Sequence, residues 1–219
     1  MPRPQACLVD VYETILSCDF VAFRRQLPVL AGIPADTWQA GYRRIDDELS
    51  TGRLSKSEGF ARIMTECGVE PRPALVRALV DKDRELLHAA ARLFDDAIPF
   101  LERLRSRGIK IAIVSNCTEH TRPLLAGLGV SALADALVLS CEVGAAKPAA
   151  EIFHYALDRL GVRPDAAVFV DDQPGYCAGA VAVGITTAQI VRGELDGKVP
   201  AAGTTVVRSL ADVEAMLWG

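Results

Sequence analysis

Short apolar runs alternate with longer segments of helical periodicity along the chain. Six of these runs have the length and composition of β-strands, and they span residues 6–9, 109–114, 136–140, 167–170, 186–191 and 204–207. Most are continuously apolar rather than alternating, which is typical of strands that are covered on both faces. Since helical segments separate most of them, the pattern predicts an α/β fold with a Rossmann-like parallel sheet.

A long helical segment interrupts this pattern, because residues 10–108 separate the first two predicted strands. Apolar residues recur there at helical spacing over 20–30, 37–49, 57–64 and 74–91, with Gly and Pro breakers between the segments. Asp36 and Ser55 fit helix N-caps, and Glu58 completes a capping box with Ser55. The sequence therefore predicts a four-helix domain over residues 17–92, inserted into a core formed by 1–16 and 93–219.

The composition excludes several classes of protein. Hydrophobic residues make up 50% of the chain and charged residues 24%, which supplies enough apolar material for a packed core and excludes disorder. The formal net charge of -4, from 24 basic and 28 acidic residues, disfavours a nucleic-acid partner. No segment is long and apolar enough to span a membrane and no secretion signal is recognised, so we expect a cytoplasmic protein.

The six cysteines are scattered without a CxxC pair, which predicts buried, reduced thiols rather than a disulfide framework. The oligomeric state is open between a monomer and a homodimer.

Polar residues that can carry chemistry follow four of the predicted strands. In an open parallel sheet these positions meet at one edge, where ligands bind. Taken singly, each has an ordinary structural role as a helix cap, a turn residue or a solvated lysine. An adjacent pair of aspartates is harder to explain in this way, because two carboxylates repel unless a cation or a donor compensates. The candidates are Asp10, Ser115, Asn116, Lys147, Asp171 and Asp172.

In this order and spacing, the four segments resemble the four motifs of the haloacid dehalogenase-like (HAD) hydrolase superfamily, and the helical insert is similar to its subclass I cap. The resemblance implies that Asp10 is a nucleophile that forms an aspartyl-enzyme intermediate. It also implies that Ser115 and Asn116 bind the transferring phosphoryl group. Lys147 would neutralise charge on the phosphoryl oxygens and on Asp10.

The same resemblance implies a Mg²⁺ cofactor and a small phosphomonoester as the substrate. Asp10, Asp172 and the backbone carbonyl of Tyr12 would bind the ion, with Asp171 in or just beyond its ligand sphere. Tyr12 and Thr14, in the loop after the first strand, are expected to contact the substrate as well.

Two residues depart from the usual phosphatase pattern. Tyr12 occupies the position of a second aspartate that protonates the leaving group, and Glu13 replaces a glycine. Loss of general acid catalysis matters least for good leaving groups, which favours acyl phosphates or anomeric sugar phosphates. Tyrosine at this position is also characteristic of 2-haloacid dehalogenases, so dehalogenation is an alternative. A catalytically weak protein that binds a phosphorylated ligand is a further alternative.

The Asp171–Asp172 pair favours the phosphatase, because dehalogenases tend to carry neutral residues there. A dehalogenase would also need an arginine in the insert, and Arg43 or Arg44 is a candidate for binding substrate. The ordinary alternative pairs these arginines with Asp46, Asp47 or Glu48 on a solvated helix face.

Several other side chains have weaker functional interpretations. Trp38 and Tyr42 lie one turn apart and are expected to pack in the core of the insert, although they could line the substrate entrance. His120 is expected on a helix surface. Tyr176 is expected to shield the site.

Overall fold

The computed structural model describes residues 4–193 and 199–218. Six parallel strands form one sheet in the order β5-β4-β1-β6-β7-β8. This confirms the predicted Rossmann-like α/β fold, and each strand lies within two residues of its predicted bounds. The strands are β1 (Ala6–Val9), β4 (Lys110–Ser115), β5 (Ala136–Leu139), β6 (Ala167–Asp171), β7 (Thr186–Ile190) and β8 (Thr204–Val207).

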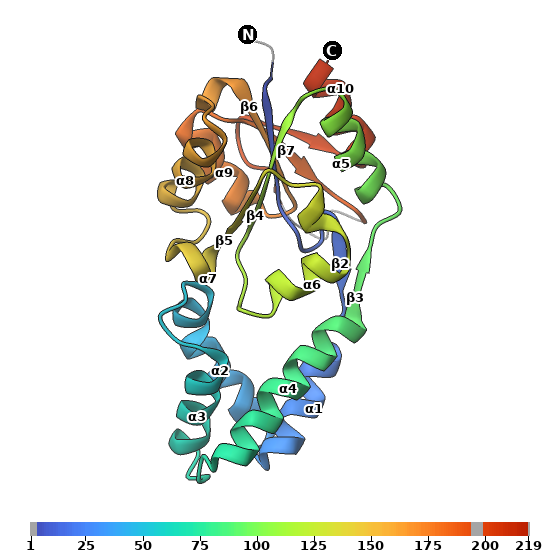
Figure 1. Ribbon diagram of the computed structural model, residues 1–219. Coiled ribbons are helices and arrows are strands. Elements are labelled where there is room, and N and C mark those ends of the chain that lie inside the picture. The colour runs from blue at the N-terminus through green and yellow to red at the C-terminus, as the bar shows by residue number, and fades with distance from the viewer. Residues whose placement is uncertain (1–3, 194–198, 219) are drawn as a thin grey trace.

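Helices cover both faces of the sheet, which explains why its strands are continuously apolar. One face packs against α5 (Ala97–Ser106), α6 (Thr121–Gly127) and α10 (Leu210–Trp218), and the other against α8 (Ala150–Leu160) and α9 (Pro174–Val183). Figure 1 shows these helices on opposite sides of the sheet. The short helix α7 (Ser140–Val143) follows β5. None of the helices within the described residues is long and apolar enough to cross a membrane.

The segment between β1 and β4 contains the four helices that the periodicity predicts: α1 (Val21–Ala31), α2 (Ala35–Ser50), α3 (Lys56–Glu66) and α4 (Pro73–Ala90). We call residues 21–90 the helical insert. It has its own apolar core, where Trp38 is 2% exposed and its ring lies 5.3 Å from that of Phe60. This confirms the core-packing interpretation of Trp38.

The two predicted helix caps have different outcomes. Ser55 caps α3 and forms the capping box with Glu58. The prediction for Asp36 is wrong, because α2 begins at Ala35 and the N-cap position is occupied by Pro34. Asp36 lies instead in the first turn, where its charge still suits the positive end of the helix dipole.

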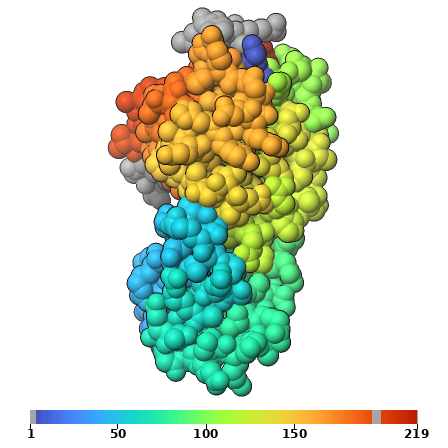
Figure 2. Space-filling model, turned by 60° about the vertical axis from the view of Figure 1, so that its left-hand side comes forward, coloured from blue at the N-terminus to red at the C-terminus, as the bar shows by residue number. Residues whose placement is uncertain are grey.

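Two short strands that the sequence analysis missed join the insert to the core. β2 (Leu16–Cys18) and β3 (Ala91–Leu93) pair as an antiparallel ribbon in which Ser17 lies opposite Arg92. Three residues are too few to show a strand periodicity, and the ribbon forms only when segments far apart in sequence meet. The insert also contacts the core directly, where the end of α2 lies against α7 (Figure 2).

Candidate active site

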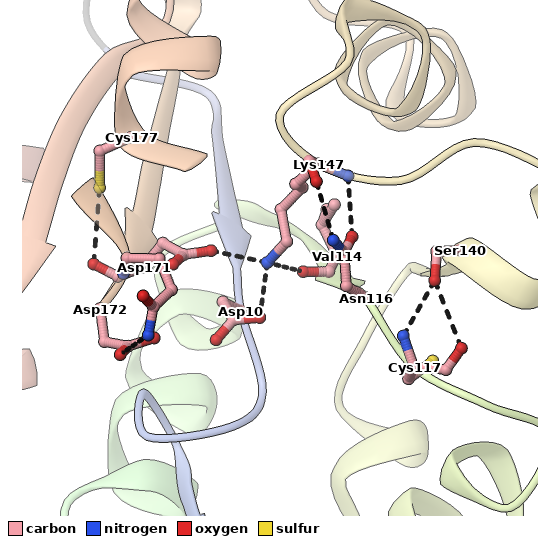
Figure 3. A network of polar contacts seen from close by, with 10 residues as sticks. Asp10, Val114, Asn116, Cys117, Ser140, Lys147, Asp171, Asp172 and Cys177 are labelled. Carbon is pink, nitrogen blue, oxygen red and sulfur yellow. Dashed lines mark hydrogen bonds and ion pairs between the residues drawn. The ribbon is translucent and has the colours of Figure 1, made fainter. Parts of the chain in front are cut away.

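The order of the strands brings the predicted site residues together at one edge of the sheet. β1 lies between β4 and β6, so Asp10, which follows β1, is flanked by Ser115 at the end of β4 and Asp171 at the end of β6. Lys147 reaches the same place from the loop after α7 (Figure 3). Residues that are up to 161 positions apart in the sequence therefore form one cluster.

Lys147 is the centre of this cluster. Its Nζ donates to Asp10 Oδ1 at 2.6 Å, to Asp171 Oδ2 at 2.6 Å and to the Val114 carbonyl at 2.9 Å. Burial alone would lower the pKa of the fully buried Lys147 ammonium, but the two carboxylates raise it well above its ordinary value. Lys147 is therefore a fixed positive charge, and its three donors are all directed at named acceptors.

Three carboxyl groups gather around this site, and two of them contact the Lys147 ammonium. Asp10, Asp171 and Asp172 each present an oxygen within 4.8 Å of the others. The pKa of Asp171 is raised to about 7, because burial and the nearby Asp10 raise it by more than Lys147 and the Gln173 N–H lower it. Negative charge therefore exceeds what Lys147 can balance, and an all-oxygen donor set of this size fits a hard divalent cation such as Mg²⁺.

Gln173 holds the two adjacent aspartates in different ways. Its backbone N–H donates to Asp171 Oδ1 at 2.8 Å, and its side-chain amide donates to Asp172. Both oxygens of Asp171 thus accept hydrogen bonds from protein groups, because Oδ2 accepts from Lys147. Asp172 is 9% exposed whereas Asp171 is fully buried, so Asp172 is the more accessible ligand of the pair.

Ser115 carries an unsatisfied hydroxyl. The residue is fully buried and its Oγ has no hydrogen-bond partner. A buried hydroxyl without a partner costs free energy of about 1–3 kcal/mol, so its retention beside a nucleophile candidate points to a ligand. Sequence reasoning found this residue, but only the structure shows that its hydroxyl is available.

Asn116 makes two contacts that the resemblance did not predict. Its Nδ2 donates to the Lys147 carbonyl at 2.8 Å, and its Oδ1 accepts from the Lys147 N–H at 2.8 Å. Both ends of the amide therefore hold the backbone of Lys147 and orient its ammonium. Contact between Asn116 and a phosphoryl group stays a prediction.

The two residues that depart from the phosphatase pattern are both engaged in contacts away from Asp10. Tyr12 Oη lies 2.9 Å from Thr121 Oγ1, and burial raises the Tyr12 pKa well above its ordinary value. Glu13 has a φ of 57°, the left-handed conformation in which glycine is ordinarily favoured, and its Oε1 accepts from the Cys18 N–H at 3.1 Å. Glu13 thus ties the loop to β2.

Thr14 and Arg192 fix the other end of this loop. The Thr14 side chain is fully buried and its hydroxyl has no partner, while its carbonyl accepts from Arg192 Nη2 at 2.6 Å and Nε at 3.1 Å. Arg192 Nη1 also donates to Asp96 at 2.8 Å. Sequence reasoning missed Arg192, since a lone arginine after a strand carries no signal of its partners.

Tyr176 lies beside the cluster as expected. The centre of its ring is 5.0 Å from Lys147 Nζ, a distance at which the ring face attracts a cation. The ring is partly buried and lies over the ammonium, so its side chain covers Lys147 instead of competing for a cation.

Two expectations about the insert and its border are corrected. Arg44 pairs with Glu66 at 2.6 Å, and the predicted acidic partners pair elsewhere, Asp47 with Arg53 and Glu48 with Arg62 at 2.5 Å. Arg44 and Glu48 of α2 thus pair with residues of α3 instead of with each other on the same helix. Arg43 is exposed on α2, and substrate contact by it stays a prediction.

His120 is the second correction. It is 6% exposed, not on a helix surface, because it sits at the N-terminus of α6 where the insert covers it. Its Nε2 lies 3.6 Å from Asp83 Oδ2 of α4.

Comparison with known proteins places the chain in a family. The family model of the haloacid dehalogenase-like hydrolases matches residues 4–184. A glyceraldehyde 3-phosphate phosphatase of Methanopyrus kandleri is 29% identical over 204 residues, covering 90% of this chain and 88% of the relative. An (S)-2-haloacid dehalogenase 4A of Burkholderia cepacia is 28% identical over 200 residues, covering 86% of this chain and 83% of the relative.

A solved structure agrees with these relatives. The crystal structure of a HAD phosphatase from Thermococcus onnurineus superposes with a TM-score of 0.69 at 27% identity, covering 98% of both chains. Phosphatases and dehalogenases thus match at similar identity, which shows a hydrolase without choosing between the two reactions. The chain belongs to the haloacid dehalogenase-like hydrolase family.

Proposed function

We propose that this hydrolase is a Mg²⁺-dependent phosphatase that cleaves a small phosphomonoester through an aspartyl-phosphate on Asp10. The observation that carries the proposal is the excess of carboxyl groups over ammonium at the sheet edge, where the oxygens of Asp10, Asp171 and Asp172 lie within 4.8 Å of one another. A carbon–halogen substrate gives no reason to gather three carboxylates, because the displacement needs one nucleophile and no metal.

Asp10 and Asp172, with the Tyr12 carbonyl, would hold the ion, and Asp171 would support it through the contacts that already orient its carboxylate. When bound, Mg²⁺ would offset the charge on the phosphoryl oxygens, which otherwise repel an anionic nucleophile.

The chain's own residues supply the remaining functions. A carboxylate oxygen of Asp10 attacks phosphorus as the bond to the leaving oxygen breaks, and water later hydrolyses the acyl phosphate. The Ser115 hydroxyl donates to a phosphoryl oxygen, which satisfies its unmet hydrogen bond. Lys147 orients the Asp10 carboxylate, and Asn116 keeps Lys147 in place.

The leaving group receives little help from the protein in this arrangement. Tyr12 replaces the usual acid and is directed to Thr121, while Glu13 is directed to the Cys18 backbone. We therefore propose substrates whose leaving group needs little protonation, such as acyl phosphates or anomeric sugar phosphates. Glu13→Gln should leave turnover within about twofold of wild type, and a loss within the general-acid range of roughly 10²–10⁴ would assign Glu13 as the acid.

Dehalogenation of a 2-haloacid is the second candidate. Tyr12 favours it, as does the similarity to the (S)-2-haloacid dehalogenase 4A. In this reaction Asp10 would displace halide from carbon to form an ester, and Arg43 is a candidate for binding the substrate carboxylate.

One experiment separates the two reactions. The purified protein is assayed for phosphate release from a panel of phosphomonoesters and acyl phosphates, and for halide release from 2-chloropropionate, each with Mg²⁺ and with a chelator. Phosphate release that the chelator abolishes supports the proposal, and halide release that is insensitive to the chelator reverses it. Stabilisation by Mg²⁺ and a phosphate analogue with no turnover of any substrate would indicate a binding protein instead.

A further inference from the structure

Two cysteines outside the proposed catalytic machinery lie in neighbouring loops at the same edge of the sheet. β4 and β5 are adjacent parallel strands in which Ser115 lies opposite Leu139. Cys117 and Cys141 each follow these paired residues by two positions. Adjacent strands are about 4.8 Å apart, and a disulfide joins Cα atoms roughly 4.4–6.8 Å apart. The strand register thus places the two cysteines where a bond between them is geometrically accessible.

Two sets of contacts keep these loops together beyond the end of the sheet. The Ser140 side chain accepts from the Cys117 N–H at 2.9 Å and donates to the Cys117 carbonyl at 3.4 Å (Figure 3). The Arg122 guanidinium donates to both oxygens of Glu142, at 2.6 and 2.5 Å. Ser140 and Glu142, the two neighbours of Cys141 in the sequence, therefore each link its loop to the segment that follows β4, and neither link uses a cysteine thiol.

The two thiols also interact directly and differ in character. They share a hydrogen bond that lowers the pKa of Cys141 and raises the pKa of Cys117 well above its ordinary value. The partial burial of the Cys141 thiol and the negative charge of Glu142 both oppose this lowering of the Cys141 pKa. Cys141 is thus the thiol that more readily becomes a thiolate, and Cys117 is the protonated donor beside it.

Access to the pair is from a cavity between the insert and the core. This cavity has a volume of about 400 Å³, and Cys141 lines it together with Arg122 and residues of the insert that include Gly52 and Leu54. Cys117 is 6% exposed and is not among the residues that line this cavity. A small oxidant can therefore reach Cys141 before it reaches Cys117.

We propose that Cys117 and Cys141 form a redox-reactive dithiol, which a peroxide converts reversibly to an intramolecular disulfide, with Cys141 as the attacking thiol. The Cys141 thiolate attacks one peroxide oxygen and becomes a sulfenic acid, releasing hydroxide that is protonated to water. The Cys117 sulfur then attacks the sulfenic sulfur, and its proton leaves with the hydroxyl group as a second water. Two thiols lose two electrons and two protons, and the peroxide is reduced to two water molecules.

The position of the pair gives this modification a route to the active site. Cys117 directly follows Ser115 and Asn116, and its thiol interacts with Thr121, the partner of Tyr12. Gly52 of the insert lies so close to Cys141 that a Cβ there would meet the Cys141 carbonyl at 1.9 Å. A disulfide would therefore constrain both the loop that holds Ser115 and the contact between insert and core.

Peptide mapping tests the proposal without depending on any enzymatic activity. The folded protein is treated with hydrogen peroxide, and the cysteine thiols that remain free are alkylated. The chain is then cleaved after glutamate residues. Cleavage at Glu102, Glu119 and Glu142 places Cys117 in peptide 103–119 and Cys141 in peptide 120–142. We expect these two peptides to be joined by a bond that dithiothreitol breaks. Absence of the joined pair, or equal joining of either peptide to other cysteines, would overturn the proposal.

Two variants and one matched control define the roles of the thiols. Cys117→Ser should trap the sulfenic acid on Cys141 as a dimedone adduct, and Cys141→Ser should give no joined peptides. Cys67, a half-buried thiol at the end of α3, is the control, and Cys67→Ser should leave the joined pair unchanged. In the wild-type protein we expect alkylation of Cys141 to be faster than that of Cys67, because the contact with Cys117 favours the Cys141 thiolate. Equal rates would contradict the assignment of Cys141 as the attacking thiol.

Discussion

Within residues 4–193 and 199–218, two buried lysines contact carboxylates, and they differ in how their charge is balanced. In the core, Lys147 contacts the carboxyl groups of Asp10 and Asp171, and the carboxyl group of Asp172 belongs to the same cluster. In the insert, Lys56 Nζ donates to Asp83 at 3.2 Å and to the Tyr42 hydroxyl at 2.7 Å.

One carboxylate matches one ammonium at Lys56, whereas carboxyl groups outnumber the ammonium three to one at Lys147. The core cluster has more carboxyl groups than its one ammonium can offset, and it also contains the Ser115 hydroxyl, which has no hydrogen-bond partner. A balanced buried pair is typical of a structural contact, and a surplus of one sign is typical of a site that receives an ion or a substrate. The comparison therefore separates structural from functional buried charge within one chain.

The largest expected effect comes from removing the nucleophile in the core cluster. Asp10→Asn keeps the shape of the side chain but removes its negative charge, so turnover of any accepted substrate should fall on the order of 10³-fold or more. Lys147 retains Asp171 as a partner, so we expect the variant to fold. The measurement is the initial rate of product release, with circular dichroism as the folding control. Turnover near that of wild type would exclude Asp10 as the nucleophile.

The second largest effect is expected on stability, when the buried charge of Lys56 is removed from the insert. Lys56→Met leaves Asp83 buried without its cation, and the free energy of unfolding should fall by about 3–5 kcal/mol. Replacing both partners, as Lys56→Met with Asp83→Leu, should restore much of that loss, because no buried charge is then left unpaired. Urea unfolding of the three proteins measures the difference. A double variant that is no more stable than Lys56→Met would show that the pair matters for more than charge balance.

A third prediction concerns the surplus charge at Lys147. Mg²⁺ should stabilise the folded protein, by about 2.7 kcal/mol at a concentration a hundred times its dissociation constant. Asp172→Asn should remove most of that stabilisation, since Asp172 is the more accessible aspartate of the adjacent pair. Thermal unfolding with and without Mg²⁺ measures the effect, and Asp158→Asn on the exposed side of α8 is the matched control. Equal Mg²⁺ stabilisation in the Asp172 and Asp158 variants would remove Asp172 from the ligand set.

The smallest effect is a pH dependence at the edge of the Lys56 cluster. Burial lowers the pKa of His120 below its ordinary value of 6.5, with Lys56 and Arg84 acting in the same direction and Asp83 and Glu119 opposing. Below pH 6.5 the unfolded state therefore binds more protons at this position than the folded state, so His120 destabilises the fold as the pH falls.

Urea unfolding at several values between roughly pH 5 and pH 8 checks this sign. The free energy of unfolding should decrease more steeply on acidification in the wild type than in His120→Gln. Parallel curves for the two proteins would show that His120 does not contribute.

The fold was predictable from the sequence to a large extent, and the candidate site in part. The apolar runs identified all six strands of the main sheet, and the Ser55 and Glu58 pattern identified the start of α3. The β2–β3 ribbon was not predictable, because each strand has three residues and its partner is about 75 positions away. Asp36 shows the limit of local rules, since Pro34 and Ala35 began the helix two residues before the residue with the better capping side chain.

The residues at the strand ends were identified correctly as a cluster, but their partners were not. Nothing in the sequence indicated that Asn116 holds the backbone of Lys147, or that Arg44 pairs with Glu66 across two helices. These contacts depend on the conformation of loops and on how helices pack, and neither leaves a periodic signal.

By itself, the sequence determined the alternation of strands and helices and the chemical groups that each strand delivers to the sheet edge. It did so because burial on both faces imposes a local apolar pattern, and because parallel strands end on the same side. The tertiary structure alone decided which groups are satisfied and which are not: the balance at Lys56, the excess at Lys147, the unpaired hydroxyl of Ser115 and the meeting of Cys117 with Cys141. Hydrogen bonding and charge balance depend on distances between side chains far apart in the chain, and only folding sets those distances.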